Sequence, residues 1–226
     1  NGTSGSTNAT CYGIYAGSNS LTAMSATLGG ANYDNMTIQN NEVKRAYIGI
    51  HVYGGAAPNQ NDNLVVRGNI IGSTTQADYI GFKGINAYQN LTGLIEANTI
   101  SNIRAISSIN IAGIEVGGTA SNGVTVSRNR LESLYSESTG GWGCYGVNLV
   151  GGTNHIVVNN VITDIRTTNY NATSTTYNAF GIRITTGTGH KIYYNSINLF
   201  GDYTSTSWTA ASSAALLITS TVVTGL

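Results

Sequence analysis

Apolar and polar residues alternate in short runs along this chain, and the runs recur at a nearly constant interval. The stretch 146–162 reads G-V-N-L-V-G-G-T-N-H-I-V-V-N-N-V-I, two alternating segments separated by a Gly-Gly break. Alternation over four or five residues, bounded by Gly, Asn, Ser and Thr, predicts short β-strands. Successive side chains of a strand point to opposite faces, so each segment has an inward and an outward side.

Two motifs mark the repeat. An asparagine recurs at intervals of 28, 29, 31, 31 and 35 residues, with a β-branched residue three positions before it and an aliphatic residue two positions after it. Its six copies are Asn41, Asn69, Asn98, Asn129, Asn160 and Asn195. The second motif, G-[IV]-x-[VILA], begins at Gly13, Gly49, Gly84, Gly113, Gly146 and Gly181. A period of this size indicates a repeat architecture.

The repeat length predicts the fold. It accommodates three short strands and three turns, whereas it is too short for a propeller blade and lacks the pattern of helical repeats. A single rung, meaning one turn of the coil, cannot bury its inward face alone, so stacked rungs must share a core. We therefore predict an all-β parallel β-helix, or solenoid, of about six to seven rungs of 28–36 residues over residues 11–226. Residues 1–10 are expected to be frayed or to belong to an upstream rung.

Composition narrows the class of protein. Charged residues make up 9% of the chain and the net charge is zero, whereas an average globular protein has about 25% charged residues. A neutral surface disfavours nucleic-acid binding, which needs a basic footprint. No segment reaches 18 uninterrupted apolar residues, so no membrane span is predicted.

The two cysteines, Cys11 and Cys144, each stand two residues before a motif glycine and therefore share one column of the predicted stack. Four rungs separate them, roughly 19 Å at about 4.8 Å per rung. A disulfide needs Cα atoms about 4.4–6.8 Å apart. We predict two buried free thiols.

The G-I-x-V strand and the N-x-I corner resemble the repeat of right-handed parallel β-helix proteins, the pectate lyase-like family. The resemblance covers roughly residues 11–226 and implies a right-handed, single-stranded coil. It also implies that the six asparagines form an internal hydrogen-bonded ladder, a position suited to Asn because Asn tolerates a left-handed backbone. The segment N-T-I-S-N-I and the Ser/Thr-rich loops look like repeats of bacterial secreted or surface proteins, which implies an extracellular or cell-surface location.

One outward column is the first candidate site. Its members, at the x position of G-I-x-V, are Tyr15, His51, Asn86, Glu115, Asn148 and Arg183. We expect them to form one exposed polar line, and in pectate lyase-like enzymes polysaccharide lies on this sheet face. If the chain is an enzyme, its catalytic residues would be Glu115, His51 and Arg183. However, glycoside hydrolysis usually needs two carboxylates, and a calcium-assisted lyase needs clustered acids.

The loops form the second candidate site. Segments 136–142, 167–176 and 201–213 follow the asparagine motif in successive rungs and should stack at one corner, and insertions in repeat proteins often build the binding face. The candidate ligand-binding residues are Trp142, Trp208, Tyr170 and Tyr203. Their rings could stack on sugars or simply cover the sheet. His155 and His190 share one repeat position beside glycines and are interpreted as turn residues. No metal ligand set and no cofactor motif is found.

Three functions stay open. The leading hypothesis is a non-catalytic, extracellular segment of a larger surface protein that serves as a stalk or adhesin and contacts a glycan or cell-surface ligand. Its final residues, S-T-V-V-T-G-L, lack a polar cap, so further rungs, domains or subunits are expected to adjoin it. The rival is a polysaccharide lyase or hydrolase that uses the G-I-x-V face. The third is a carbohydrate-binding module that uses Trp142 and Trp208.

Overall fold

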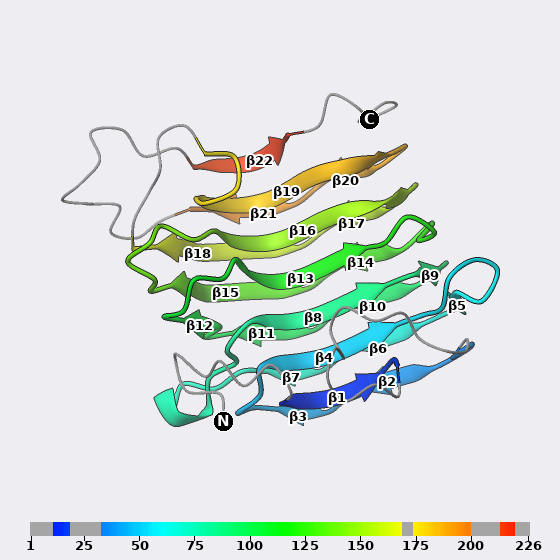
Figure 1. Cartoon of the computed structure of the whole chain (residues 1–226), viewed down its shortest axis with the longest axis horizontal. Helices are drawn as coiled ribbons and strands as arrows, with labels where there is room; N and C mark the ends of the chain where they lie inside the picture. Colours follow the sequence, from blue (N-terminus) through cyan, green and yellow to red (C-terminus); the bar gives the residue numbers. More distant parts are fainter. Residues whose placement is uncertain (1–10, 19–32, 169–173, 200–212, 220–226) are drawn as a thin grey trace.

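A computed structural model of the chain describes residues 11–18, 33–168, 174–199 and 213–219, which form a stack of parallel strands (Figure 1). The structure confirms the predicted all-β parallel solenoid, with about five turns where six to seven rungs were predicted. The segment 1–10 lies outside the described residues. Right-handedness of the coil stays a prediction.

Each turn of the solenoid contributes strands to three parallel sheets. The first sheet, built from the G-I-x-V motif, contains β1 (Tyr12–Ala16), β4 (Ile48–Tyr53), β8 (Lys83–Tyr88), β13 (Ile111–Gly117), β16 (Cys144–Thr153), β19 (Ala179–Thr188) and β22 (Ala214–Ile218). The second contains β2 (Thr37–Gln39), β6 (Val65–Arg67), β10 (Leu94–Glu96), β14 (Thr125–Ser127), β17 (Ile156–Val158) and β20 (Lys191–Tyr193).

The third sheet follows the ladder asparagines. It contains β3 (Glu42–Val43), β7 (Ile70–Ile71), β11 (Thr99–Ser101), β15 (Arg130–Ser136), β18 (Val161–Thr167) and β21 (Ser196–Asn198), with β12 (Arg104–Ala105) paired to β15. A short pair, β5 (Asn61–Asp62) and β9 (Asn90–Leu91), lies between the first and second sheets along the chain. The helical content of the described residues is one 3₁₀ turn, Gln76–Asp78.

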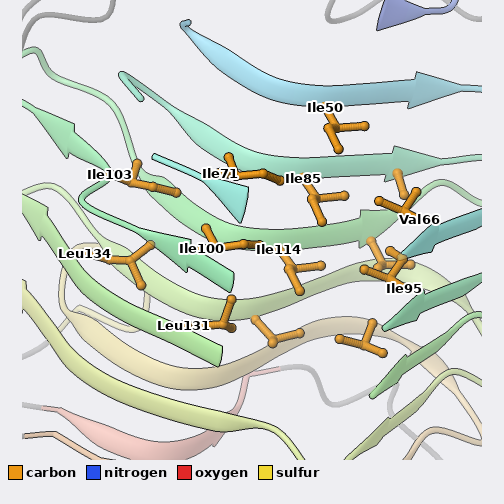
Figure 2. Packing of buried hydrophobic residues seen from close by; sticks show 14 of the residues in the cluster. Ile50, Val66, Ile71, Ile85, Ile95, Ile100, Ile103, Ile114, Leu131 and Leu134 are labelled. Carbon is orange, nitrogen blue, oxygen red and sulfur yellow. The ribbon is translucent and has the colours of Figure 1, made fainter. Parts of the chain in front are cut away.

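The inward residues of the three sheets fill a continuous core. Isoleucines of consecutive rungs pair directly in the first sheet, as Ile50 with Ile85 and Ile85 with Ile114. Figure 2 shows these side chains facing others from the second and third sheets, such as Ile95 and Ile100. All five are fully buried. Because each rung places the same kind of residue at the same position, the core consists of stacked like side chains.

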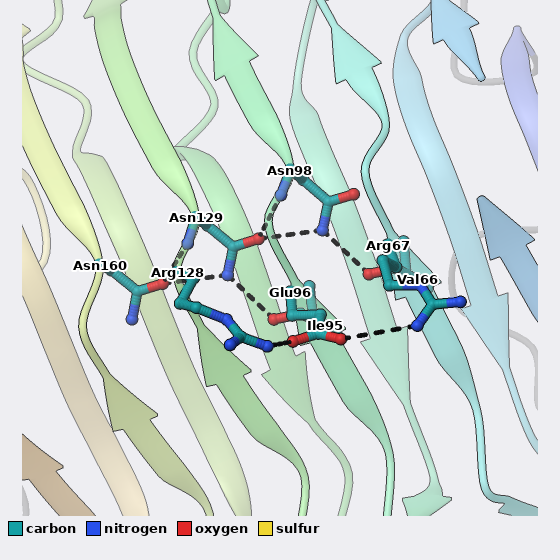
Figure 3. Close-up of polar contacts among 8 residues, drawn as sticks. All are labelled: Val66, Arg67, Ile95, Glu96, Asn98, Arg128, Asn129 and Asn160. Atoms are coloured by element: carbon teal, nitrogen blue, oxygen red, sulfur yellow. Dashed lines mark hydrogen bonds and ion pairs between the residues drawn. The ribbon is translucent and has the colours of Figure 1, made fainter. Parts of the chain in front are cut away.

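The asparagine ladder predicted from the repeat is present (Figure 3). Asn129 Oδ1 accepts hydrogen bonds from the backbone N–H of Asn98 at 3.0 Å and from Asn98 Nδ2 at 2.9 Å. Asn98 Nδ2 also donates to the Val66 carbonyl at 3.0 Å. The same amide-to-amide pattern links every consecutive pair from Asn41 to Asn195. The ladder therefore ties each turn to the next through buried polar groups.

The expectation that the ladder asparagines themselves adopt a left-handed backbone is wrong. The positive φ angle, between 52° and 64°, falls on the residue immediately before each of them. Those residues are Asn40, Gly68, Ala97, Arg128, Asn159 and Tyr194. The preceding residue makes the sharp turn, and the asparagine that follows points its amide inward. Asn is therefore required at the ladder position for its hydrogen bonds, while the turn position accepts varied side chains.

Beside the ladder, Figure 3 shows Glu96 between two arginines on the outer side of the second sheet. Arg128 forms a close ion pair with Glu96, and Arg67 NH1 lies 4.0 Å from the same carboxylate. Both arginine side chains are more than half exposed, whereas that of Glu96 is 9% exposed. Because the arginine of each pair lies largely in solvent, which screens the attraction, these ion pairs contribute little to stability.

The two cysteines are free thiols. Cys144 begins β16 and is fully buried, as predicted, whereas Cys11, which precedes β1 four strands away in the first sheet, is only partly buried. Burial raises the pKa of the Cys144 thiol to about 12. That thiol is therefore protonated and unreactive at neutral pH.

His155 and His190 do lie at a corner, as predicted, but their side chains point into the solenoid and are fully buried. The two rings stack with centroids 5.1 Å apart. The backbone N–H of Val124 donates to His155 Nδ1 at 3.2 Å, and that of His155 donates to His190 Nδ1 at 3.3 Å. The imidazoles thus replace core aliphatic side chains and continue the hydrogen bonding between rungs.

Candidate functional site

The outward column of the first sheet is not the exposed polar line that the alternation predicted. His51, Asn86, Glu115, Asn148 and Arg183 are all buried, with at most 8% of each residue exposed. Large side chains from neighbouring outward positions and loop residues cover them. The column is therefore a layer of buried polar groups on the outer face of the sheet, and such groups require hydrogen-bond partners.

Lys83 joins this layer because the motif glycine interrupts the strand alternation. Lys83 stands three residues before Asn86, an odd spacing that in a regular strand would place the two side chains on opposite faces. In the structure, Lys83 Nζ donates to Asn86 Oδ1 at 3.1 Å, so both lie on the outer face. Between them, a Cβ at Gly84 would meet the carbonyl oxygen of Gly113 at 2.6 Å. Gly84 is therefore a point of close backbone contact that no other residue fits.

Glu115 of β13 lies at the centre of the polar layer. Lys83 Nζ lies 2.5 Å from its Oε1, and the Tyr88 hydroxyl donates to the same oxygen at 2.6 Å. Asn148 Nδ2 donates to Oε2 at 2.8 Å. Both carboxylate oxygens are therefore occupied by protein donors from the two neighbouring strands, β8 and β16.

These contacts keep Glu115 ionised. Burial alone raises the pKa of this carboxyl, but the charge and the hydrogen bond of Lys83 oppose that effect. Hydrogen bonds from Tyr88 and Asn148 act in the same direction as Lys83, so the pKa of Glu115 is held below its ordinary value. Burial, and then the charge of Glu115, raise the pKa of Tyr88, which stays a neutral donor. Glu115 is thus a fixed acceptor at neutral pH.

Arg183 of β19 belongs to the same polar layer, where three hydrogen bonds hold its guanidinium. Its Nε donates to the Thr175 carbonyl at 3.0 Å, and NH2 donates to Thr176 Oγ1 at 3.3 Å. NH1 donates to Asn148 Oδ1 at 3.3 Å, and the guanidinium lies 4.9 Å from the centroid of the Tyr145 ring. Among the described residues no carboxylate forms an ion pair with Arg183.

A pocket of about 310 Å³ opens over this part of the sheet, between the strand starts of β8, β13, β16 and β19 and the loops that precede them. It is lined by Phe82, Lys83, Ser108, Ile109, Asn110, Glu115, Trp142, Tyr145, Asn148 and Arg183. Among these residues Glu115 is the one carboxylate. Aromatic walls and a few fixed polar groups are typical of small-molecule sites, which have volumes of roughly 300–1,000 Å³.

The structure brings together Glu115, Arg183 and Trp142 from the two predicted candidate sites. His51 lies outside the pocket, two rungs from Glu115, but hydrogen bonds connect it. His51 Nδ1 lies 2.9 Å from Asn86 Nδ2, and Asn86 in turn accepts from Lys83. His51 also stacks on Tyr15, with ring centroids 5.2 Å apart. It therefore has a structural place in the polar layer and does not reach the pocket.

The predicted stacking of the loops is seen where they are described. Thr167 Oγ1 donates to the Trp142 carbonyl at 2.7 Å, and the Trp142 ring lies 5.1 Å from the Tyr177 ring in an edge-to-face arrangement. Trp142 is half-buried at the edge of the pocket. The other three predicted ligand-binding residues, Trp208, Tyr170 and Tyr203, lie outside the described residues.

Sequence reasoning missed Lys83, Tyr88 and Tyr145 as parts of this site. Tyr88 and Tyr145 stand at outward positions flanking the x column, where an aromatic residue reads as a surface residue. Lys83 carried a usable signal, since it immediately precedes a motif glycine where the other copies have Tyr12, Ile48, Ala112, Tyr145 and Phe180. A lysine at an otherwise uncharged position, one rung from Glu115, indicates an ion pair across neighbouring strands.

Within the described part of the chain, no group of three or more His, Cys, Asp and Glu side chains is placed to hold a metal ion. No helix there is long and apolar enough to cross a membrane. No family model matches the chain, and neither a curated protein nor a solved structure matches it significantly.

Proposed function

We propose that this chain is a non-catalytic segment of a larger extracellular or cell-surface protein, a stalk or adhesin that holds a glycan in the pocket beside Glu115. The proposal includes a right-handed coil of the pectate lyase-like type, supported by the asparagine ladder and the G-I-x-V sheet. The observation that carries it is a pocket whose walls are aromatic and whose polar groups are fixed by one another.

The lining of the pocket suits a sugar ring. Trp142, Tyr145 and Phe82 give the pocket aromatic walls, with Arg183 over the Tyr145 ring and Lys83 over the Phe82 ring. Asn148, Asn110 and Ser108 add polar groups to the lining. A rigid aromatic body with a polar neighbour provides both contact area and orientation at low entropic cost. The volume of about 310 Å³ lies at the small end for ligand sites, which favours one ring over a long chain segment.

The same geometry argues against acid–base chemistry. A general acid must carry a proton near neutral pH, whereas the pKa of Glu115 is held below its ordinary value. Hydrolysis by the usual route also needs a second carboxylate across the scissile bond, and the described lining residues supply one. Glu115 therefore supports the architecture of the pocket.

Exposed apolar residues of the last described strand favour the proposal that this chain is part of a larger protein. Leu216 and Ile218 of β22 are 43% and 40% exposed, and together with Ile192 they line an apolar hollow at that end of the stack. An adjoining rung or subunit would cover them, as terminal repeats of solenoids require.

A binding and turnover assay tests the proposal. The protein is incubated with a panel of neutral and acidic oligosaccharides, binding is followed by calorimetry, and the products are followed by mass spectrometry. We expect binding without cleavage, weakened at least 10-fold by Trp142→Ala. Tyr193→Ala is the matched control, because Tyr193 is 42% exposed on the second sheet, away from the pocket. Absence of binding, or equal loss in both variants, would contradict the proposal.

A polysaccharide lyase or hydrolase is the second candidate, because Glu115 and Arg183 share one pocket. Cleavage products that disappear in Glu115→Gln, with the fold retained by circular dichroism, would establish this reading and overturn the first.

A further inference from the structure

The charges around the pocket do not balance. Lys83 and Glu115 form a pair with 12% and 10% of their side chains exposed, and they neutralise each other. Arg183 is 8% exposed. Its described partners, Asn148, Thr175 and Thr176, are neutral acceptors. The layer therefore carries one buried positive charge without a described counter-charge, and burying a charge without an ion partner is costly.

Arg183 also has unused donors. A guanidinium has five N–H bonds, and three contacts to neutral acceptors are formed. One face of the group lies over the Tyr145 ring at 4.9 Å, which fixes its plane. Arg183 is one of the residues that line the open pocket, which places its side chain beside a ligand held there.

We infer that the pocket binds a ligand that carries a single negative charge, a carboxylate or a sulfate, and that Arg183 pairs with this group while an adjoining ring packs on Trp142. The inference rests on the proposed function, since it names the chemical class of glycan held by the same pocket. Glu115 does not repel such a ligand strongly, because Lys83 lies 2.5 Å from it and cancels its charge. A planar fork such as Arg183 matches the oxygens of a carboxylate or sulfate better than a point charge does.

The test compares three sugars that differ only in the group at C6, with inorganic sulfate as a fourth ligand. Titration calorimetry at fixed ionic strength measures glucose, glucuronate, glucose 6-sulfate and inorganic sulfate against the wild-type protein and against Arg183→Gln, Arg183→Lys and Arg67→Gln. We expect wild type to bind glucuronate at least 10-fold more tightly than glucose. Arg183→Gln should abolish that preference, Arg183→Lys should keep part of it, and Arg67→Gln, on the exposed second sheet, should keep all of it.

The outcomes separate the two ideas. Equal affinity of wild type for glucose and glucuronate overturns the charge inference while the glycan proposal stands. Binding of sulfate that requires Arg183, without any sugar binding, supports the anion site and overturns the glycan proposal. Retained preference in folded Arg183→Gln overturns the assignment to Arg183. If Arg183→Gln does not fold, the wild-type preference and its competition by inorganic sulfate decide the question.

Discussion

The six ladder asparagines do not carry equal numbers of hydrogen bonds. Asn98 Oδ1 accepts from both the backbone and the side chain of Asn69, and Asn98 Nδ2 donates to Val66 and Asn129. Asn41, at the first described rung, donates to Gln39 and Asn69, and the described contacts give its Oδ1 no donor. Asn98 therefore satisfies buried backbone groups of the preceding rung and bonds the asparagines on both sides, while Asn41 satisfies fewer groups.

This difference predicts unequal costs for the same substitution. Asn98→Ala leaves the buried Asn69 N–H without its acceptor and removes the bonds of Asn98 to Val66 and Asn129, and a buried polar group left without a partner costs about 1–3 kcal/mol. We expect the free energy of unfolding to fall by about 3 kcal/mol or more. Asn41→Ala leaves no buried backbone N–H without its acceptor, so it should cost about 1 kcal/mol or less. Urea titrations followed by circular dichroism compare the two variants, and similar losses would show that the ladder is not energetically important.

At the residue scale the sequence predicts what is repeated and misses what is local. The ladder was predictable because the same amide recurs in register six times. The burial of Glu115 was not, because it depends on Lys83 and Tyr88 of one neighbouring strand and on Asn148 of the other. Alternation assigns each residue to a face of the sheet, but it does not predict whether neighbouring side chains on that face cover the residue.

Neighbouring strands of the first sheet come into close backbone contact at a column of glycines. A Cβ added at Gly84 would meet the Gly113 carbonyl oxygen at 2.6 Å and Ile100 Cγ2 at the same distance. A Cβ added at Gly13, Gly49, Gly113 or Gly146 would likewise meet the carbonyl oxygen of the next motif glycine at 2.5–2.8 Å. The close contact involves the backbone, so a side chain there cannot be accommodated by a change of rotamer. The column sets how closely neighbouring rungs pack and also turns residues such as Lys83 outward.

Gly84→Ala tests the column against a matched glycine. We expect a loss of about 2–3 kcal/mol in the free energy of unfolding, because an extra methyl in a packed region forces the backbone to shift. At Gly93, also buried, a Cβ would meet Val124 Cγ2 at 3.4 Å in near-ordinary contact. Gly93→Ala should therefore be neutral or stabilise by about 0.4–1 kcal/mol. Equal destabilisation of both variants, measured by thermal unfolding, would contradict the role given to the column.

At the element scale the strands of the repeat follow from the sequence, whereas the site does not. The pocket forms where the loop containing Trp142 and the residues 108–110 stand above the starts of four strands. Those loops differ in sequence and length from rung to rung, so the repeat pattern does not predict their conformation. The sequence does predict that variation collects at one corner, and Trp142 was identified on that basis alone.

Across the whole molecule, each turn pairs with the turns on either side of it, so a change in one rung is felt first by its neighbours. The stacked His155 and His190 lie near the end of this array, between β16 and β20. Their column holds Leu64 and Val124 in earlier rungs, which shows that the position accepts an aliphatic side chain. The two imidazoles therefore place titratable groups at a core position that is aliphatic in earlier rungs.

Burial, and then the neighbouring His190, lower the pKa of His155 from 6.5 to about 4. Burial also lowers the pKa of His190. The unfolded chain consequently takes up protons first as the pH falls, so stability is complete above about pH 6.5 and is lost toward pH 4. For His155 alone, the free energy of unfolding should fall by about 2 kcal/mol between pH 7.5 and pH 5, and His190 acts in the same direction.

The paired substitution His155→Val with His190→Val keeps the core apolar and removes both titrations. We expect it to flatten the pH dependence of the free energy of unfolding between pH 7.5 and pH 5, measured by urea titration at each pH. Leu64→Val is the control, because Leu64 lies in the same column and is fully buried but carries no titratable group. That control should keep the slope. A slope that survives the double substitution would place the acid sensitivity elsewhere, whereas its loss, together with early hydrogen exchange in β17 and β20 of the wild type at pH 5, would show that acid opens the solenoid from this corner.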